Sequence, residues 1–355
     1  MSTRLALSPR TVAIVTGASR GLGQAFAHEL VTQCTHVLTL ARQAQADKQT
    51  ALIAAQHGCQ LQHIACDLSD AAQWPAIAEQ VQAWFKQLGS TSAQEPVAIF
   101  KQEPSFKQEP SADIAQQEPR LSNTEQAQTT AAALLPERYL LINNAGTLGP
   151  MAQYSGLAEL GSESAAIAQA MNLNISAVIY LSSVFVHTAK SSHDNALAHT
   201  VAVNHDNAFV AAVPSSHGTD ALLTPAVPSS YDADASQTPK IQVINISSGA
   251  ARNPYPGWAV YCASKAALDR YSEVLQVEAP FAQIVSIAPG VLDTAMQADI
   301  RQSCAEDFPN VQRFIDLHAE HALSSPPAVA KQILAYSLSP EFGQQTLQDI
   351  RLITP

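Results

Sequence analysis

The sequence predicts a single α/β domain built on a doubly wound parallel sheet, and three observations carry that prediction. Short apolar runs alternate with amphipathic stretches, a glycine-rich turn joins the first run to the first amphipathic stretch, and two low-complexity segments interrupt the pattern. Alternating strands and helices are typical of a parallel sheet that helices cover on both faces. We therefore expect one layered domain with two insertions.

The strands are predicted from continuous apolar runs, because a strand buried on both faces lacks the alternation of a half-exposed one. Helices are predicted where apolar residues recur at helical spacing between those runs. The predicted strands are residues 11–16, 36–40, 61–65, 139–143, 241–246 and 284–288, and the predicted helices lie near residues 21–33, 44–57, 70–87, 164–188, 258–278 and 325–337.

Two segments lack a packing pattern. Residues 88–137 are rich in Gln, Glu, Ser and Pro and contain the repeat FKQEPS twice, and residues 190–239 are rich in Ser, Ala, His and Asp. Such compositions are typical of disordered insertions. Subtracting them leaves about 255 residues, the size of one large domain. Both segments connect a helix to the next strand, at the edge opposite to that where such sheets bind ligands, so we expect them to lie away from the chemistry.

Composition excludes several classes of function. Only 14% of the residues are charged, the net charge is −11, and no run of Lys or Arg could follow a phosphate backbone, so we expect no nucleic-acid partner. No stretch approaches the roughly 18 consecutive apolar residues of a spanning helix, and the start lacks the apolar core of a secretory signal. We expect a cytoplasmic protein without membrane association. The five cysteines contain no CxxC pair, which predicts neither a disulfide framework nor a metal site.

The first predicted strand runs into the sequence TGASRGLG, residues 16–23, and then directly into a helix. Glycines at such a turn let the backbone approach a pyrophosphate, and the amino end of the helix offers N–H groups and a positive dipole. The motif is informative because it follows a strand and opens a helix. It predicts a Rossmann-type dinucleotide site that includes Gly17, Ala18, Ser19, Arg20, Gly21, Leu22 and Gly23.

The ends of the second and third predicted strands indicate which dinucleotide binds. An NAD enzyme commonly places an acidic residue after the second strand, on the ribose 2′-hydroxyl, but this chain has Ala41 followed by Arg42. The guanidinium groups of Arg42 and Arg20 suit a 2′-phosphate, which favours NADP(H). Asp67 and Leu68 follow the third strand, where an adenine would lie, although Asp67 would serve equally well as a helix cap.

The later strands carry residues suited to proton transfer. The Asn-Asn-Ala-Gly sequence at residues 143–146 leaves room beside a cofactor, or forms a turn. Ser248 follows the fifth predicted strand, and Tyr261 and Lys265 lie four residues apart on one face of a predicted helix. An ammonium beside a phenol favours the phenolate, so we expect the pKa of Tyr261 to be lowered.

Together these motifs resemble the pattern of the short-chain dehydrogenase/reductase family, over the whole chain apart from the two insertions. The family pattern of TGxxxGxG, NNAG, Ser, YxxxK and PG is complete. The resemblance implies that Ser248, Tyr261 and Lys265 are catalytic together with an asparagine, which is Asn174 by spacing. It also implies cofactor contacts from Asn144, Ala145, Gly146, Tyr261, Lys265, Pro289, Gly290, Leu292, Asp293, Thr294, Met296 and Gln297.

The resemblance implies a reaction and an assembly. Hydride passes from NADPH to the carbonyl carbon of a small molecule, Tyr261 protonates the carbonyl oxygen, and Ser248 holds that oxygen. Asn174 would help to pass protons in from solvent. Members of the family commonly pair long helices, so we expect a homodimer formed through the helices near residues 164–188 and 258–278.

Within the family the chain is most similar to the sepiapterin reductases, at residues 141–149, 245–248, 257–265 and 288–297. In those enzymes an aspartate near the carboxyl terminus anchors the pterin, and Asp349 takes that position. The resemblance implies substrate contacts from Ser248, Gly249, Tyr261, Gly290 and Asp349. Residues 296–321 would form a substrate lid, with Trp258, Phe308 and Phe314 as pocket walls or as core packing.

Two alternatives remain open on the sequence. The residues that flank Asp349 depart from the terminal pattern of the sepiapterin reductases, so a benzil-type diketone reductase or a broad carbonyl reductase is the alternative enzyme. A protein that senses NADP or acts as a scaffold is the alternative outside catalysis, with the repeated insertions as its interaction surface. The intact Ser248, Tyr261 and Lys265 favour an enzyme.

Overall fold

The computed structural model describes residues 7, 10–90, 136–159, 161–208 and 240–353. In this part of the chain seven parallel strands form one sheet in the order β3-β2-β1-β4-β5-β6-β7, which confirms the predicted doubly wound sheet. The strand order reverses between β1 and β4, where open sheets bind their ligands. The strands are β1 (Thr11–Thr16), β2 (His36–Ala41), β3 (Gln60–Ala65), β4 (Arg138–Asn143), β5 (Lys240–Ile246), β6 (Ala282–Ala288) and β7 (Leu347–Asp349).

The structure divides into two compact units. The first comprises Met1–Ala83, Pro136–Lys190 and Ala233–Pro355, and it contains the whole sheet and every predicted site residue. The second comprises Trp84–Leu135 and Ser191–Asp232. Only residues 84–90 and 191–208 of the second unit are described, as the ends of two helices. Most of the two predicted insertions, residues 91–135 and 209–239, therefore lies outside the described residues.

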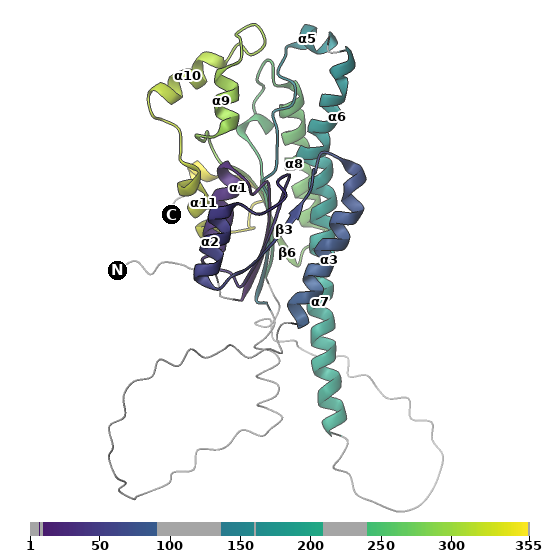
Figure 1. Ribbon diagram of the computed structural model, residues 1–355. Coiled ribbons are helices and arrows are strands. Elements are labelled where there is room, and N and C mark those ends of the chain that lie inside the picture. The colour runs from purple at the N-terminus through teal and green to yellow at the C-terminus, as the bar shows by residue number, and fades with distance from the viewer. Residues whose placement is uncertain (1–6, 8–9, 91–135, 160, 209–239, 354–355) are drawn as a thin grey trace, which may run out of the picture. The chain divides into compact units, whose positions relative to one another are not determined.

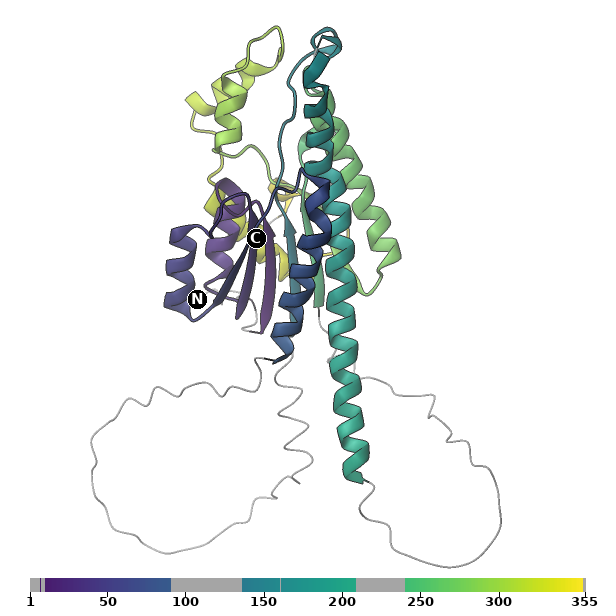
Figure 2. The same ribbon diagram turned by 45° about the vertical axis from the view of Figure 1, so that its right-hand side comes forward.

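Helices cover both faces of the sheet (Figure 1). Helices α1, α2 and α11 lie on one face, and α8 lies on the other with those parts of α3 and α7 that belong to the first unit (Figure 2). The helices are α1 (Gly21–Leu30), α2 (Lys48–His57), α3 (Trp74–Ser90), α5 (Tyr154–Ala158), α6 (Ala165–Met171), α7 (Ala177–Ala208), α8 (Ala259–Glu278), α9 (Ala295–Arg301), α10 (Val311–Ala319) and α11 (Pro326–Ser337), with short 3-10 turns η1 (Ala71–Gln73), η3 (Gly161–Ser164), η5 (Gly249–Ala251) and η6 (Ile350–Leu352).

The strands form where the apolar runs predict them, because five of the six predicted runs are almost wholly buried: β1, β2, β4, β5 and β6. The seventh strand, β7, was not predicted. It has only three residues, all half-buried, and it pairs with β6 at the edge of the sheet. So short a segment carries no apolar run that would mark it.

Helix α7 differs from the prediction at its carboxyl end. The helix continues to Ala208, so the expectation of disorder from residue 190 onward is wrong for residues 190–208. The physical reason lies in the sequence, where no proline or glycine follows until Pro214, and Ala is frequent. At its other end α7 continues α6 through one π-helical turn, η4 (Asn172–Ser176).

The helical run Ala165–Asn195 has the length and mean hydropathy of a membrane-spanning helix. Half of its most apolar window is buried inside the protein, as expected for a helix that packs on a sheet. Val178, Leu181 and Phe185 are among its buried residues. Burial in the core therefore accounts for half of this apolar window.

Apolar side chains of α8, α9 and α10 and of the segments before them form one buried cluster. Helices α9 and α10 lie beyond the carboxyl ends of the strands (Figure 1). Trp258 is the centre of this cluster, because its ring stacks on Phe308 at 4.5 Å and also contacts Phe314 and Tyr261. At Gly257, which has a φ of +86°, a Cβ atom would lie 2.1 Å from the carbonyl oxygen of Asp307. The close approach of these two backbones fixes the segment before α10 against the start of α8.

Candidate active site

A cavity of about 640 Å³ opens at the carboxyl ends of the strands. It brings together most of the residues that the sequence predicts for the cofactor and the substrate. These are Gly17, Ser19, Arg20, Gly21, Leu22, Ala41, Arg42, Asp67, Leu68, Asn144, Ala145, Gly146, Ser248, Gly249, Tyr261, Lys265, Pro289, Gly290, Leu292, Thr294, Met296 and Gln297. Of the predicted residues, Ala18, Gly23, Asn174, Asp293 and Asp349 do not line it within the described chain.

The glycine-rich turn is held by close backbone packing. A Cβ atom at Gly23 would lie 2.2 Å from the carbonyl oxygen of Gly17, and one at Gly17 would lie 2.9 Å from the Cα of Ala145. Gly17 also has a φ of +68°, which favours glycine. Gly23 therefore acts by letting the first turn of α1 pack on the loop, although it does not line the cavity.

The segment after β4 braces this turn. The backbone N–H groups of Asn144 and Ala145 both donate to Thr16 Oγ1 at 3.0 Å. The side-chain amide of Asn144 donates to the carbonyl oxygens of Thr16 and Gly17, at 3.1 and 3.3 Å. Asn144 thus shapes the loop that would bind a pyrophosphate as well as the cavity wall.

Two arginines stand at the end of β2 and in the glycine loop. Arg20 and Arg42 are exposed at the cavity, and neither guanidinium group forms a hydrogen bond or ion pair with another described residue. Nearby, Asp67 accepts from the Ser69 backbone N–H at 2.9 Å and from the Ser69 hydroxyl at 2.7 Å. The Ser69 hydrogen bonds, and then the charge of Arg42, lower the pKa of Asp67. The cavity therefore offers two available guanidinium groups beside one carboxylate.

Tyr261 lies on the first turn of α8 and is buried in the cavity wall. Burial raises the pKa of its phenol, and the hydrogen bond with Ser248 opposes that shift. The expectation of a lowered pKa is therefore wrong, because the loss of hydration outweighs the hydrogen bond with Ser248. A raised pKa keeps the phenol protonated, which is the form that can give a proton to a carbonyl oxygen.

Lys265 lies one turn further along α8 and is also buried. Its ammonium donates to the carbonyl oxygen of Ile246 at 2.8 Å, and it lies 5.9 Å from the centre of the Tyr261 ring. Burial lowers the pKa of Lys265 to about 8, against the opposing charge of Asp269. A Cβ atom at Gly146 would lie 3.6 Å from this Nζ, so a glycine there leaves the ammonium accessible from the cavity.

Asn174 lies in the π turn between α6 and α7 and is fully buried. Its amide accepts from the Thr147 N–H at 2.9 Å and donates to the Thr147 carbonyl at 2.8 Å and to the Ser264 hydroxyl at 3.0 Å. A π turn shifts the side chains that follow it and often occurs at functional sites. Here the turn directs Asn174 to the segment after β4, behind the cavity wall.

Ser248 lies two residues beyond β5 and caps the short turn η5, where its hydroxyl accepts from the Ala250 N–H at 3.1 Å. Its hydroxyl also shares a hydrogen bond with Tyr261. The two hydroxyl groups therefore converge on one point of the cavity. They can hold one carbonyl oxygen between them.

The residues present fit a nicotinamide dinucleotide. The glycine cradle would accept its pyrophosphate, and the N-cap Thr294 opens α9 beside Gly21, where a Cβ atom would lie 3.4 Å from the Thr294 methyl group. Gln297 is buried in the wall with neither of its amide atoms hydrogen-bonded to a described residue. Buried amides are seldom left without a partner, so Gln297 is suited to a polar group of a ligand.

Asp349 is engaged by Arg351. The Arg351 guanidinium donates to both carboxylate oxygens, at 2.9 and 2.5 Å, and the Arg351 N–H donates to the same carboxylate at 3.0 Å. These hydrogen bonds lower the pKa of Asp349. Arg351 lines the cavity and Asp349 does not, so the carboxyl-terminal segment presents a cation there.

The end of the cavity beside Ser248 and Tyr261, which we call the carbonyl end, has an aromatic wall. Trp258 and Phe314 line it, as predicted, whereas Phe308 is fully buried behind Trp258. Tyr255 and Arg313 also line it, and Arg313 donates to the Tyr255 hydroxyl at 3.3 Å. Tyr255, Arg313 and Arg351 were not predicted from the sequence. The proximity of Arg351 to Asp349 in the sequence was the signal that could have pointed to it.

No metal centre is found within the described residues, where no three His, Cys, Asp or Glu side chains are grouped so that they could hold a metal ion. All five cysteines are free thiols. Burial raises the pKa of Cys59 and of Cys66 to about 11, which keeps both thiols protonated.

Comparison with known sequences identifies related enzymes. A family model described as short chain dehydrogenase matches residues 11–90 and 234–305. Benzil reductase, (S)-benzoin forming, from Bacillus cereus is 28% identical over 336 residues, which are 93% of this chain and 95% of that enzyme. Sepiapterin reductase from Rattus norvegicus is 51% identical over 61 residues, which are 17% of this chain and 23% of that enzyme. The first similarity runs along almost the whole chain, and the second is confined to a short segment.

Comparison with solved structures identifies the same fold. The crystal structure of the KRED1-Pglu enzyme superposes with a TM-score of 0.58 at 20% identity and covers 94% of this chain and 99% of its own. A 3-oxoacyl-[acyl-carrier protein] reductase from Brucella melitensis, in complex with NAD, superposes with a TM-score of 0.55 at 16% identity and covers 96% and 95%. At these identities the likeness establishes the fold alone.

Proposed function

This chain belongs to the short-chain dehydrogenase/reductase family, and on that premise we propose that it is an NADPH-dependent reductase of benzil-type aromatic diketones. The observation that supports the proposal is the carbonyl end of the cavity, where Ser248 and Tyr261 converge beside the aromatic rings of Trp258 and Phe314. Two flat aromatic groups on a diketone would pack against such a wall. The similarity to a benzil reductase over almost the whole chain supports the same substrate class.

The residues of the chain divide the work of carbonyl reduction. A nicotinamide cofactor bound at the glycine loop supplies the hydride. Ser248 and Tyr261 hold the carbonyl oxygen, and the Tyr261 phenol gives it a proton as the carbon is reduced. The Lys265 ammonium then stabilises the phenolate that remains, because its charge lies 5.9 Å from the ring.

Proton return to Tyr261 would pass through the buried polar groups behind it. Gly146 has no Cβ atom, and one placed there would lie 3.3 Å from Asn174 Oδ1 and 3.6 Å from Lys265 Nζ. Both polar atoms therefore adjoin one small space, in which a water molecule would have polar partners. We propose that Asn174 and Lys265 restore the Tyr261 proton through that space.

The proposal of NADPH rests on charge at the end of β2. Arg20 and Arg42 are available at the cavity, Ala41 is the residue before Arg42, and Asp67 already accepts two hydrogen bonds from Ser69. A 2′-phosphate would gain two charge-assisted contacts there, whereas a 2′-hydroxyl would leave both guanidinium groups without a partner.

A pterin remains the second candidate substrate, because one segment of the chain is 51% identical to a sepiapterin reductase. The state of Asp349 favours the diketone. A carboxylate anchors a pterin by accepting hydrogen bonds from its amino groups, but Arg351 already donates to both oxygens of Asp349. A pterin would therefore have to displace an ion pair, which a diketone need not disturb.

The test is NADPH oxidation at 340 nm with benzil, sepiapterin and a simple aldehyde offered in parallel to the wild-type protein and to Asp349→Ala. We expect kcat/KM to be at least about tenfold higher for benzil than for sepiapterin, and Asp349→Ala to change the benzil value less than about threefold. If the wild-type protein prefers sepiapterin and Asp349→Ala abolishes that preference, the substrate is a pterin. Binding of NADPH without turnover of any of the three would favour a sensor.

We further propose a homodimer formed through the outer faces of α7 and α8. Ile179 on α7, Val274 and Val277 on α8, and Phe281 beyond it are exposed apolar side chains, and Val277 is 81% exposed. Apolar side chains gathered on neighbouring helices are typical of an interface. Sedimentation equilibrium should give twice the chain mass for the wild type and the chain mass for Val277→Glu. A wild-type monomer at micromolar concentration would contradict this assembly.

A further inference from the structure

Three consecutive residues, the last of β5 and the two that follow it, are held to α8. The Ile246 carbonyl accepts from Lys265 at 2.8 Å, the Ser247 hydroxyl donates to Asp269 at 2.6 Å, and Ser248 shares a hydrogen bond with Tyr261. Two of these α8 side chains belong to the proposed reaction. Asp269, one helical turn beyond Lys265, has no assigned part in it.

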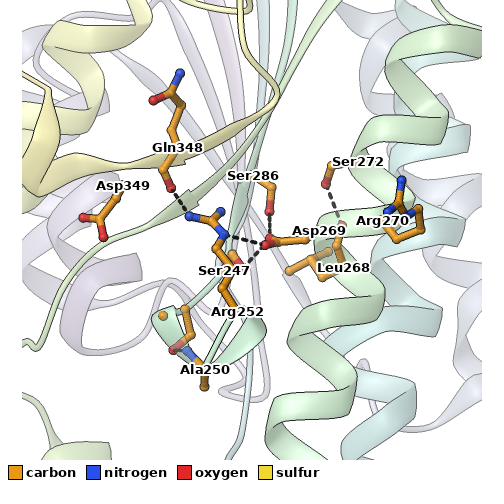
Figure 3. A network of polar contacts seen from close by, with 12 residues as sticks. Ser247, Ala250, Arg252, Leu268, Asp269, Arg270, Ser272, Ser286, Gln348 and Asp349 are labelled. Atoms are coloured by element: carbon orange, nitrogen blue, oxygen red, sulfur yellow. Dashed lines mark hydrogen bonds and ion pairs between the residues drawn. The ribbon is translucent and has the colours of Figure 1, made fainter. Parts of the chain in front are cut away.

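Asp269 is buried and fully engaged. Its carboxylate accepts from Ser247 at 2.6 Å, from the Ser286 hydroxyl on β6 at 2.7 Å and from Arg252 Nε at 3.0 Å. Figure 3 shows these contacts meeting at the one carboxylate, and Arg252 reaching on to the Gln348 carbonyl of β7 at 3.3 Å. One side chain therefore connects α8 with β5, β6 and, through Arg252, β7.

Burial removes the hydration of the Asp269 carboxylate, and the two serine hydroxyls and the Arg252 guanidinium compensate for that loss. The charge of Asp269 also acts on a second group. Asp269 and Lys265 are four residues apart on α8, so they lie on one face of the helix. A negative charge at that position favours the ammonium form of a lysine that burial would otherwise discharge.

We propose that Asp269 is a positioning residue, which with Arg252 fixes the Ser247–Ser248 segment after β5 against α8 and keeps the Lys265 amine protonated during carbonyl reduction. The proposal rests on the proposed reductase function. Lys265 faces Tyr261 on its own helix and the Ile246 carbonyl on β5, and Asp269 faces Arg252 from the turn after β5. Beyond Arg252 the nearest charges on the terminal segment are the paired Asp349 and Arg351.

Two substitutions separate this role from a structural one, because they should move the pH profile in opposite directions. Asp269→Asn keeps the shape but removes the negative charge, so Lys265 should lose its proton at lower pH. We expect the alkaline decline of kcat with benzil to begin about one pH unit earlier, with kcat reduced about tenfold at pH 9 and less than about threefold at pH 6. Arg252→Gln keeps the carboxylate and removes its cation, so the decline should move to higher pH.

The matched control is Glu273→Gln, which removes a carboxylate from the same helix. Glu273 pairs with Arg270 on the surface of α8, so its loss should leave the profile unchanged. A second readout is independent of turnover: the carbon-13 NMR titration of labelled lysine side chains in cofactor-free protein, with Lys265→Met to assign the signal. The midpoint of Lys265 should fall in Asp269→Asn and rise in Arg252→Gln.

Several results would overturn the proposal. If both variants lose kcat equally at every pH and the titration midpoint of Lys265 does not change, the hydrogen-bond network around Asp269 has only a structural role. A shift in the same direction in both variants would exclude the charge argument. If Asp269→Asn does not fold, Arg252→Gln and the lysine titration still decide the question. A wild-type protein that reduces no carbonyl would instead defeat the proposed function, and the NMR midpoints would still test the pairing.

Discussion

The nucleotide end of the cavity and its carbonyl end are built in different ways. At the nucleotide end, Gly17 and Gly23 lie so close to backbone atoms and to the Asn144 side-chain amide that neither has room for a Cβ atom. At the carbonyl end, the wall consists of side chains such as Trp258, Phe314 and Arg351, and the ring centres of Trp258 and Phe314 lie 5.4 Å apart. The close packing at the nucleotide end restricts which residue each of these positions can hold. The side-chain wall at the carbonyl end tolerates substitution, so we expect that substrate preference can change there without loss of cofactor binding.

The largest expected effect lies where the two ends meet, at Tyr261. Tyr261→Phe removes the proton donor but leaves the ring and the glycine loop intact, so we expect kcat to fall by about a thousandfold with NADPH affinity changed less than about threefold. Stopped-flow kinetics measure the fall in kcat, and a fluorescence titration measures the affinity for NADPH. A mutant with near-normal turnover would contradict the catalytic assignment.

The next effect tests the backbone packing of the nucleotide end. In Gly23→Ala the new Cβ atom would lie 2.2 Å from the Gly17 carbonyl oxygen, so the turn must open. We expect NADPH affinity to fall at least about a hundredfold, or about 2.7 kcal/mol. Gly58→Ala is the control, because Gly58 also has a positive φ but no atom within 4 Å of the added Cβ. It should cost about 1 kcal/mol of folding free energy and leave NADPH affinity unchanged.

A smaller and more selective effect is expected at Arg42. Arg42→Ala should raise the KM for NADPH by about tenfold to thirtyfold and leave the KM for NADH nearly unchanged, because only NADPH has a 2′-phosphate to lose a charge-assisted contact. Steady-state kinetics with both cofactors measure the ratio. Arg270→Ala, an exposed arginine on α8, is the control. Equal effects on both cofactors would remove the argument for NADPH.

The smallest effect tests the tolerance of the carbonyl end. Phe314→Ala removes one ring from a wall of several, so we expect the KM for benzil to rise about fivefold and the KM for NADPH to stay constant. A loss of NADPH binding in this variant would mean that the two ends are not independent, which would break the comparison.

The same contrast explains what the sequence could predict. Gly17 and Tyr261 could be placed from the chain alone, because a strand, a glycine turn and a helical spacing of four determine their positions. The pairing of Asp349 with Arg351 could not, because it depends on which way two side chains turn at the edge strand β7. The pKa of Tyr261 was predicted in the wrong direction for a similar reason, since burial is a property of the packed site and not of the spacing to Lys265.

The helix lengths show a further limit of prediction. Helix α8 begins and ends within one residue of its predicted bounds, where Trp258 precedes it and Ala279 follows it. Helix α7 continues well past its predicted end, because a Ser- and His-rich composition does not stop a helix when no proline or glycine is present. The change in composition near residue 190 therefore indicated where the amphipathic pattern of α7 ends, but not where the helix itself ends.

Arg252 bonds to Asp269 on one side and to the Gln348 carbonyl on the other. The residues that would tune proton transfer and the terminal segment that faces the substrate thus share one structural link. Mutations at these two places should be epistatic: a change at residues 348–351 that alters substrate choice will have a different effect when Arg252 or Asp269 is also changed. An evolutionary path to a new carbonyl substrate in this scaffold therefore depends on the order in which such substitutions arise.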